Sequence, residues 1–315
     1  MRKVGAMRGV RWVDGSVVVG EAVEPAGDGV VLDVAAAGIC GTDLHFLREA
    51  GQGFVMGHEF AGTVDGVPYA VEPTVFCGTC EQCRGGSTQR CTNDRINIGI
   101  SRDGGLADRV LVPEYGLIPL PEGLAVEDAS LVEPASVSWH GARRAAIAPG
   151  ERVAVVGGGT IGLLAGAAVQ HLGHDRVALE ARHGHQREAG ERLGLVTPTG
   201  EYDVVIDAAG TESALARCGE LVRPGGRVVL LGVSTGTLAV PGVATLVKEI
   251  TWVGSMGRCR HDGIRESDEA AALLASRPEI PQTLITHRFA LDDAAEAFRI
   301  ADDKTSGALK VILVP

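Results

Sequence analysis

The sequence predicts an α/β fold, with a doubly wound parallel sheet in its second half and room for another domain before it. Two observations predict this. From residue 151 to 255, short apolar runs alternate with helix-like segments, the order typical of parallel strands joined by crossover helices. The first apolar run ends in a glycine-rich turn that leads directly into a helix. The length of 315 residues suits two domains of ordinary size or one large domain.

The composition is that of a globular protein and narrows the choice of partners. Hydrophobic residues make up 45% and charged residues 22%, which excludes wholesale disorder and a coiled coil. The 29 basic and 40 acidic side chains give a net charge of -11. A negative surface repels phosphate polymers, so we expect no nucleic acid partner.

The chain carries no segment that we interpret as a membrane anchor or a secretory signal. Two basic residues near the start are not followed by an apolar stretch. The uncharged stretch from Val153 to His174 contains six glycines, and a buried strand, a turn and a helix explain it better than a membrane span. We therefore expect no membrane partner and a cytoplasmic location.

The glycine turn has the pattern G-x-G-x-x-G, which alone is a weak signal. Here it follows the apolar run at 152–156 and precedes an apolar helix, the setting in which a dinucleotide pyrophosphate approaches a helix N-terminus. An α/β domain without a ligand is the alternative. The predicted cofactor-binding residues of this turn are Gly157, Gly159, Thr160, Ile161 and Gly162.

The remaining strands and helices of this half follow in alternation. Strands are predicted at 176–181, 203–210, 225–233 and 250–255, and helices at 185–194 and 211–222.

The end of the second predicted strand bears on the choice between NAD and NADP. An acid there accepts hydrogen bonds from the ribose of NAD. Counting back from the following helix places Ala181 at this position, with Arg182 next, and a locally basic run continues to Arg187. This favours NADP, whose 2′-phosphate a cation attracts. A shift of one residue would instead place Glu180 there and restore the NAD pattern.

Four of the seven cysteines follow the spacing C-x2-C-x2-C-x7-C. Short gaps let thiolates converge from a tight loop, so the pattern predicts a closed, structural zinc site, with an iron–sulfur cluster as the alternative. The absence of an export signal disfavours disulfides. Cys218 and Cys259 are interpreted as ordinary thiols. The predicted structural ligands are Cys77, Cys80, Cys83 and Cys91.

A second metal set is predicted from residues of mixed type. A thiolate, an imidazole and one or two carboxylates can hold zinc with a coordination position left open, as catalysis requires. Taken singly, each of these residues is better explained as a core or surface residue. The members of the set are Cys40, His58, Glu59 and Glu133.

Three residues near Cys40 add to this prediction. The hydroxyl of Thr42 could pass a proton from a metal-bound alcohol to His45, nearer solvent. Asp43 could hold the far nitrogen of His58. The alternatives are a helix cap for Thr42 or Asp43 and a surface position for His45.

These motifs together resemble the medium-chain zinc alcohol dehydrogenases. GICGTDLH at 38–45, GHEF at 57–60, the cysteine lobe, LVEP at 131–134 and VGGGTIG at 156–162 occur in that family's order, and the match covers nearly the whole chain. Glutamate in LVEP is similar to the polyol, sugar and threonine dehydrogenase branch.

The resemblance implies a GroES-like β-rich catalytic domain at 1–135 and 257–315, with the structural zinc lobe at 77–91, and a Rossmann domain at 136–256. It implies two zinc ions per chain, with Cys40, His58 and either Glu59 or Glu133 on the catalytic ion. It also implies that Lys310 touches the cofactor phosphates. Members are dimers or tetramers, so we expect a homodimer or homotetramer, with strands near 238–253 as the interface.

The implied activity is reversible hydride transfer between a secondary alcohol or polyol and a nicotinamide cofactor. The substrate is a small alcohol or carbonyl compound, with Phe46, Phe54 and Trp139 as candidate pocket residues. The alternatives are a non-catalytic protein that binds zinc and nucleotide, and a zinc hydrolase. One departure is the connection at 65–68, which is much shorter than the family usually carries, and we expect it to open the active-site rim or alter subunit packing.

Overall fold

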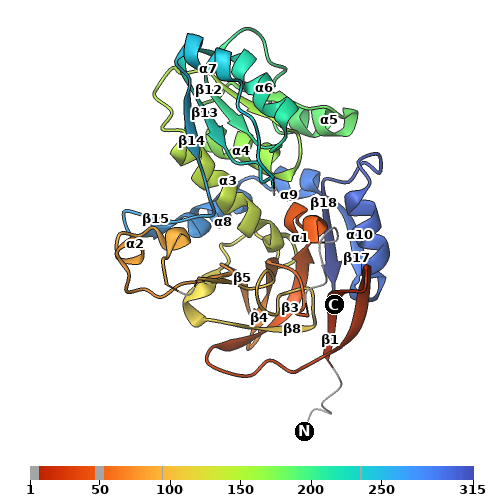
Figure 1. Ribbon diagram of the computed structural model, residues 1–315. Helices are drawn as coiled ribbons and strands as arrows, with labels where there is room; N and C mark the ends of the chain where they lie inside the picture. Colours follow the sequence, from red (N-terminus) through yellow and green to blue (C-terminus); the bar gives the residue numbers. More distant parts are fainter. Residues whose placement is uncertain (1–6, 47–52, 94, 235) are drawn as a thin grey trace. The chain divides into compact units, whose positions relative to one another are not determined.

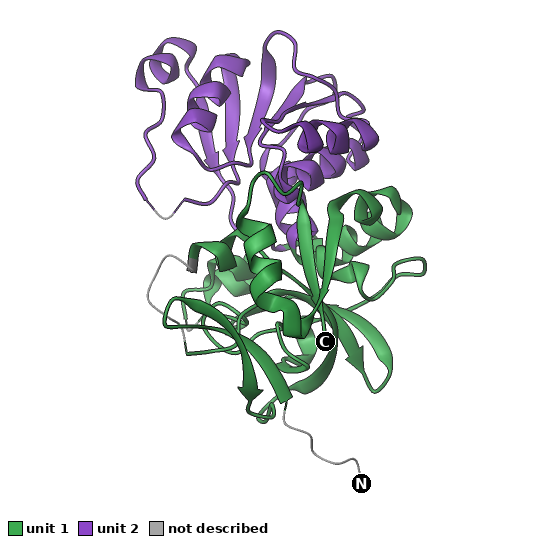
Figure 2. Cartoon of the chain, turned by 90° about the vertical axis from the view of Figure 1, so that its right-hand side faces the viewer, with its two compact units in different colours: residues 1–133, 260–315 green, residues 134–259 purple. Residues whose placement is uncertain are grey.

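The computed structural model describes residues 7–46, 53–93, 95–234 and 236–315. The chain divides into two compact units (Figure 2). Both ends of the sequence build the first unit, Met1–Glu133 with Arg260–Pro315, and the middle builds the second, Pro134–Cys259. The sequence had placed these divisions after residues 135 and 256.

The first unit is built on a seven-stranded sheet in which most neighbours are antiparallel. The strand order is β17-β18-β3-β4-β5-β9, and β8 also pairs with β3. The last strand of the chain therefore returns to the sheet of the first residues, as the resemblance implies. The strands are β3 (Val30–Gly38), β4 (Glu59–Val64), β5 (Val67–Val71), β8 (Arg109–Val112), β9 (Leu117–Pro119), β17 (Ile285–Ala290) and β18 (Lys310–Val314).

Shorter elements surround this sheet (Figure 1). The two-stranded pairs are β1 (Met7–Val13) with β2 (Ser16–Ala22), β6 (Thr74–Val75) with β7 (Ile96–Asn97), and β15 (Arg260–His261) with β16 (Ile264–Arg265). The α-helices are α1 (Gly41–Phe46), α2 (Glu81–Arg84), α8 (Glu266–Ser276), α9 (Glu279–Leu284) and α10 (Ala294–Asp302). The 3-10 turns are η1 (Thr88–Arg90), η2 (Glu114–Gly116), η3 (Asp128–Leu131) and η4 (Leu291–Asp293).

The core of the first unit lies between its sheet and the amphipathic helix α10. Ala294, Ala297 and Phe298 follow the helical repeat and are buried, so one face of α10 is apolar. They share one hydrophobic cluster with Leu32 of β3 and Phe60 of β4. This packing fixes β3 and β4, the strands that border the predicted catalytic metal set.

The short connection between β4 and β5 is a tight hairpin. Val64 pairs with Val67, and the two residues between them, Asp65 and Gly66, have φ values of 50° and 81°. Two successive left-handed residues are typical of the type I′ turn, which matches the twist of paired strands. The two residues of this turn are therefore sufficient to connect β4 to β5.

The second unit contains the predicted doubly wound sheet. Five strands lie in the order β11-β10-β12-β13-β14, and every neighbouring pair is parallel. All four residues of β10 are buried, as expected for a strand covered on both faces. The strands are β10 (Val153–Val156), β11 (Val177–Glu180), β12 (Tyr202–Asp207), β13 (Val222–Leu230) and β14 (Thr251–Gly254).

Helices cover both faces of this sheet. On one face, Ala154, Ala178 and Val205 cluster with Ala214 and Cys218 of α6. On the other, α4 and α5 pack against β11. The helices of this part are α3 (Val132–Arg144), which begins at the end of the first unit, α4 (Thr160–His171), α5 (Gly184–Arg192), α6 (Glu212–Leu221) and α7 (Gly242–Lys248).

Of the strands expected near residues 238–253, the structure contains one, at the end of the segment. Gly242–Lys248 forms helix α7, and only Thr251–Gly254 is a strand. The segment contains several β-branched residues, but the chain must cross back over the sheet between parallel strands β13 and β14, and a helix makes that crossover.

The uncharged stretch that could have been mistaken for a membrane span is a strand, a glycine turn and a helix of 12 residues. Within the described residues, no helix combines the length and the apolar character needed to cross a bilayer.

Candidate functional site

The sheet of the first unit brings Cys40, His58 and Glu59 together. Cys40 follows β3, and His58 directly precedes Glu59, the first residue of β4. Because Gly38 and Glu59 are paired neighbours in these antiparallel strands, the end of one and the start of the other coincide. One ligand atom from each of the three side chains lies within 4.8 Å of the others.

Glycine at position 57 is required for this approach. Its φ is +97°, a left-handed conformation that favours glycine. A Cβ atom there would lie 2.5 Å from Cγ of Leu106, closer than packed carbon atoms come. Gly57 therefore lets the chain turn closely against Leu106, which places His58 beside Cys40 and Glu59.

Asp43 stabilises the geometry around Cys40 and His58. It is fully buried in α1, and its Oδ2 accepts a hydrogen bond of 2.9 Å from the backbone N–H of Cys40. Its Oδ1 lies 3.7 Å from Nδ1 of His58. Burial lowers the pKa of His58, but the neighbouring Cys40 and Asp43 raise it by more, and the net pKa is well above its usual value. Cys40 and Asp43 thus favour a positive charge at His58.

The donor set fits a zinc ion. Sulfur, nitrogen and carboxylate oxygen are all zinc ligands, and three of them close together leave a coordination position for water or substrate. Oδ1 of Asp43 and Nδ1 of His58 are buried and have no hydrogen-bond partner at this separation. A slight inward rotation of the imidazole would join them, the usual support for a histidine that binds metal through its other nitrogen.

Glu133, the alternative carboxylate, lies apart from this set. It is buried in the first turn of α3, but among the described residues only Glu59 joins Cys40 and His58 within 4.8 Å.

Lys310 forms an ion pair with Glu59 of the metal set. Its ammonium is buried on β18, donates a hydrogen bond of 3.0 Å to the backbone carbonyl of Ile39, and contacts the carboxylate of Glu59. Burial lowers the pKa of Lys310, while Glu59, Cys40 and Asp43 raise it, and the net pKa lies above its usual value. The ammonium therefore stays charged and compensates Glu59. Its contact with cofactor phosphates stays a prediction.

Thr42 and His45 lie on the short helix α1 that follows Cys40. The Oγ1 atom of Thr42 is 3.7 Å from the Sγ atom of Cys40, so the hydroxyl borders the metal set. His45 is half-buried in the last turn of the helix.

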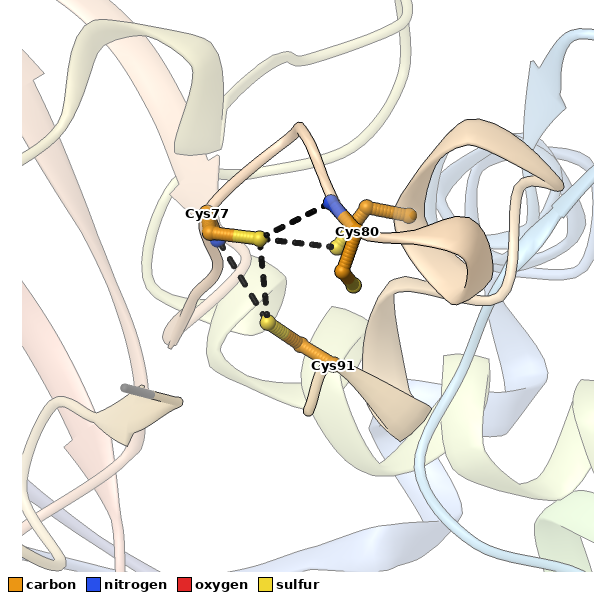
Figure 3. Close-up of side chains that lie close together, drawn as sticks. Cys77, Cys80 and Cys91 are labelled. Atoms are coloured by element: carbon orange, nitrogen blue, oxygen red, sulfur yellow. Dashed lines mark hydrogen bonds between the residues drawn. The ribbon is translucent and has the colours of Figure 1, made fainter. Parts of the chain in front are cut away.

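The four cysteines of the lobe converge as the spacing predicts, and Figure 3 shows Cys77, Cys80 and Cys91 of this group. Their Sγ atoms all lie within 4.8 Å of one another. The sulfur of Cys77 lies 3.6 Å from that of Cys91 and 4.0 Å from that of Cys83. Four sulfurs at ~2.3 Å from one zinc ion would be about 3.8 Å apart. The geometry fits a single zinc ion and disfavours an iron–sulfur cluster, whose several irons would spread the thiolates further.

Backbone amides favour the thiolate form of Cys77 and Cys80, whereas burial raises the pKa of Cys83 to about 12. The N–H groups of Thr79 and Cys80 donate to the sulfur of Cys77 at 3.4 and 3.3 Å. Amide hydrogen bonds from Thr92 and Cys83 lower the pKa of Cys80 to about 5. Deprotonated sulfur is the form that binds zinc.

In the second unit, the glycine turn has the tight form that the motif predicts. Gly157 has φ +115°, and a Cβ atom on Gly162 would lie 1.8 Å from the carbonyl oxygen of Gly157. Gly159 precedes α4, and a Cβ atom there would have no neighbour within 4 Å. Thr160 and Ile161 form the first turn of α4. The open space beside Gly159 and the following helix N-terminus suit a pyrophosphate group.

Ala181, not Glu180, follows the second strand on the side of the glycine turn. A Cβ atom on Gly158 would lie 2.5 Å from Cβ of Ala181. The guanidinium of Arg187 donates to the backbone carbonyls of Ala181 and Arg182, at 3.0 and 2.8 Å, which fixes this loop. The side chain of Arg182 is exposed.

Sequence reasoning missed Asp207, which ends β12 beside the glycine turn. Its buried Oδ1 accepts hydrogen bonds from the amides of Ala209 and Gly210, at 3.0 and 3.1 Å, and burial raises the pKa of this carboxyl. A Cβ atom on Gly157 would touch Ala208 and Ala209, so Asp207 positions the segment that borders Gly157. The signal was an acid at the end of an apolar run, followed three residues later by glycine.

Of the candidate pocket residues, Trp139 lies within the second unit. It is buried, and its ring packs against His171 and Arg143. Phe54 is half-buried, and the side chain of Phe46 lies outside the described part of the chain. Cys218 is buried in α6, and Cys259 lies 3.6 Å from Nδ1 of His140.

Comparisons with known proteins agree with both halves of this description. Residues 26–122 match the alcohol dehydrogenase GroES-like domain, and residues 160–276 match the zinc-binding dehydrogenase family. The chain is 31% identical to L-galactonate-5-dehydrogenase of Escherichia coli K12, over 87% of this chain and 88% of that protein. It is 30% identical to L-threonine 3-dehydrogenase of Saccharopolyspora erythraea, over 92% of each.

Solved structures extend the likeness to the whole fold. L-idonate 5-dehydrogenase of Escherichia coli K-12 superimposes with a TM-score of 0.87 at 27% identity, covering 99% of each chain. A zinc-binding dehydrogenase of Sinorhizobium meliloti, solved with NADP bound, gives 0.86 at 29% identity, over 99% of this chain and all of that one. The chain belongs to the medium-chain, zinc-containing alcohol dehydrogenase family, with a GroES-like and a Rossmann domain, in its polyol, sugar and threonine dehydrogenase branch.

Proposed function

We propose that this protein is a zinc-dependent dehydrogenase that transfers a hydride between a secondary alcohol or polyol and a nicotinamide cofactor. The observation that carries the proposal is the convergence of Cys40, His58 and Glu59 within 4.8 Å. A glycine turn with open space at a helix N-terminus supplies the cofactor half. Membership of a dehydrogenase family supports the same reaction class.

The residues of the catalytic set have distinct roles in this proposal. Cys40, His58 and Glu59 would hold zinc, which supplies a Lewis acid that polarises the substrate oxygen. Asp43 orients Cys40 through its amide and faces the imidazole of His58. We assign the carboxylate role to Glu59 rather than Glu133, because Glu59 is the carboxylate that lies within the set.

The proton of the substrate alcohol leaves through Thr42. Its hydroxyl borders the metal set, 3.7 Å from the sulfur of Cys40, and can accept and release a proton in one step. His45, three residues further along the same helix and only half-buried, is the acceptor nearer solvent.

A second zinc ion per chain would occupy Cys77, Cys80, Cys83 and Cys91. Four sulfur ligands leave no open position, so this ion stabilises the lobe and takes no part in the reaction. The two metal sets thus account for five of the seven cysteines.

The cofactor is NADP in preference to NAD. Support comes from Ala181, which offers no carboxylate to the ribose, and from the exposed cation Arg182 beside it. The NADP-bound relative from Sinorhizobium meliloti agrees with this assignment.

The working form is a homodimer or homotetramer. Strand β14 ends its sheet and pairs only with β13 among the described strands, so its other edge is open to a second copy. Beside it in the sequence, α7 exposes three large apolar side chains, Val243, Leu246 and Val247. An antiparallel pairing of two β14 edges would extend the sheet across the dimer and help to cover these side chains.

A substrate panel tests the proposal. Secondary alcohols, polyols and L-threonine would be offered to the zinc-loaded protein with NAD and with NADP, and reduction of the nicotinamide would be followed. We expect reduction with at least one compound, faster with NADP, and none after zinc is removed by chelation. Tight cofactor binding without turnover of any compound would instead support a non-catalytic binding protein.

A further inference from the structure

The carboxylate of Glu180 lies on the α6 face of the parallel sheet. In the register of β10, β11 and β12, Val156 is paired with both Glu180 and Asp207. Paired residues of parallel strands project from the same face. Val156 belongs to the cluster that packs against α6, so Glu180 and Asp207 share that face. The side chain of Glu180 therefore projects away from α4 and α5.

Arg217 of α6 holds this carboxylate. Its Nε atom lies 2.8 Å from one oxygen of Glu180 and 2.9 Å from the other. Its Nη1 atom donates a hydrogen bond of 2.8 Å to Glu220, on the next turn of the helix. Both side chains of the Glu180–Arg217 pair are a little more than one third exposed, at 36% and 39%. The pair is near solvent, and the single N–H of Nε, shared between both oxygens, orients the carboxylate toward Arg217.

The residues that follow Glu180 in the sequence carry no acidic side chain as far as Arg187. Ala181 lies against Gly158 of the glycine turn. Arg182 is exposed, and the half-buried rings of His183 and His185 stack with their centroids 5.6 Å apart. The loop between β11 and α5 thus presents the cation Arg182, and Arg217 neutralises the acid that precedes the loop.

We propose that Arg217 determines cofactor specificity by neutralising Glu180 and holding it away from the ribose. This inference rests on the proposed function and adds a residue to it. An NAD ribose gains little from Glu180, because the ion pair offsets its charge and orients its carboxylate toward Arg217. A 2′-phosphate meets Arg182 without a neighbouring uncompensated negative charge. Arg217 acts through Glu180 and is a positioning residue.

The experiment is a double-mutant cycle on the full-length, zinc-loaded protein. NADPH and NADH would be titrated separately against the protein and followed by the fluorescence of the reduced nicotinamide. Arg217→Met frees the charge of Glu180, and we expect NADPH binding to weaken roughly three- to tenfold while NADH binding changes little or improves. Adding Glu180→Gln to Arg217→Met should restore NADPH binding, because the side chain at position 180 then carries no charge, although Glu220 also loses its partner in both variants.

Arg223→Met provides a matched control. Arg223 is 43% exposed and pairs with Asp203 at 2.6 Å, at the amino-terminal end of β12 and so at the opposite edge of the sheet from Glu180. We expect its loss to leave the NADPH to NADH affinity ratio unchanged. Glu180→Gln alone, which leaves Arg217 unpaired, should keep or tighten NADPH binding.

The outcomes separate this inference from the proposed function. Equal weakening of both nucleotides by Arg217→Met, or no recovery in the double variant, would overturn the role of Arg217 while leaving the dehydrogenase assignment in place. If Arg217→Met does not fold, weaker NADPH binding by Glu180→Gln alone would overturn the inference. Failure of the unaltered protein to bind either nucleotide would overturn the proposed function and this inference with it.

Discussion

Lys310 and Glu59 form a buried ion pair across strand β3, which lies between the strands that carry them. Gly38, the last residue of β3, makes the contact possible. A Cβ atom there would lie 2.5 Å from Oε2 of Glu59 and 3.3 Å from Cδ of Lys310. The ammonium compensates a carboxylate that would otherwise be buried beside Cys40 and Asp43 with no cation. The metal set is therefore charge-balanced in part by the protein itself.

The first prediction concerns this pair. Lys310→Met leaves the carboxylate of Glu59 buried and without its cation, and we expect the zinc-free protein to lose about 3–5 kcal/mol of stability. The loss should be smaller with zinc bound, since the ion then compensates the carboxylate. Urea unfolding with and without zinc measures both values. The double variant Lys310→Met/Glu59→Gln should recover stability in the zinc-free form, and an equal loss in both forms would contradict the pairing.

The two zinc sets should respond differently to loss of one ligand. Cys40→Ser should abolish turnover and lower the zinc content from two ions to one, with the fold retained. Cys80→Ser should instead reduce the yield of folded protein, because structural zinc contributes directly to stability. Zinc content, circular dichroism and turnover distinguish the two results. Cys218→Ala, a buried thiol outside both sets, is the control and should keep both ions; near-normal turnover by Cys40→Ser would refute the metal assignment.

Alanine substitutions at two glycines of the cofactor turn should have different effects, one on stability and the other on cofactor binding. Gly162→Ala places a methyl group 1.8 Å from the carbonyl oxygen of Gly157, so we expect a loss of about 1–3 kcal/mol in stability. Gly159→Ala meets no atom within 4 Å and should fold normally. Its methyl group would occupy space beside the helix N-terminus, so we expect cofactor binding to weaken. Thermal unfolding and nucleotide titration of both variants test this, and unchanged cofactor affinity in Gly159→Ala would place the pyrophosphate elsewhere.

Asp207 should make stability depend on pH in a defined direction. Burial raises its pKa above 3.8, so ionising this carboxyl costs more in the folded than in the unfolded protein, and stability is lost as the pH rises through the folded pKa. Asp207→Asn keeps an oxygen for the amides of Ala209 and Gly210 without the charge. We expect the variant to gain up to about 1 kcal/mol at neutral pH, and the gain to shrink as the pH falls toward 3.8.

Urea unfolding at a series of pH values measures that difference. Asp207→Ala removes both hydrogen bonds and should be less stable throughout the series. A stability difference between Asp207→Asn and the unaltered protein that does not change with pH would contradict the raised pKa.

Local patterns were sufficient to predict much of the fold. The strand at Val153–Val156, the glycine turn and α4 are encoded by neighbouring residues, because an apolar run, glycines and a second apolar run each favour one local structure. The spacing of Cys77 to Cys91 likewise predicts convergence, since two-residue gaps limit how far the thiolates can separate. Both features depend on contacts close in sequence.

Features that depend on distant contacts were not predictable in the same way. Lys310 lies 251 residues from Glu59 in the sequence, and the residues next to each of them do not indicate that the two form a pair. Which face of the sheet Glu180 and Ala181 each occupy depends on how β11 pairs with β10, and the sequence does not show this pairing. A shift of one residue would exchange the two faces. Helix α7 lies where strands are expected near residues 238–253, because its composition does not reveal the crossover between β13 and β14.

The central claim is that zinc held by Cys40, His58 and Glu59 supports hydride transfer to a nicotinamide. It is tested most directly with an accepted alcohol that carries deuterium on its carbinol carbon. We expect mass spectrometry to find the deuterium in the reduced cofactor, transfer to stop when zinc is chelated, and transfer to resume when zinc is returned. Deuterium released to water, or transfer that continues in the zinc-free protein, would contradict it.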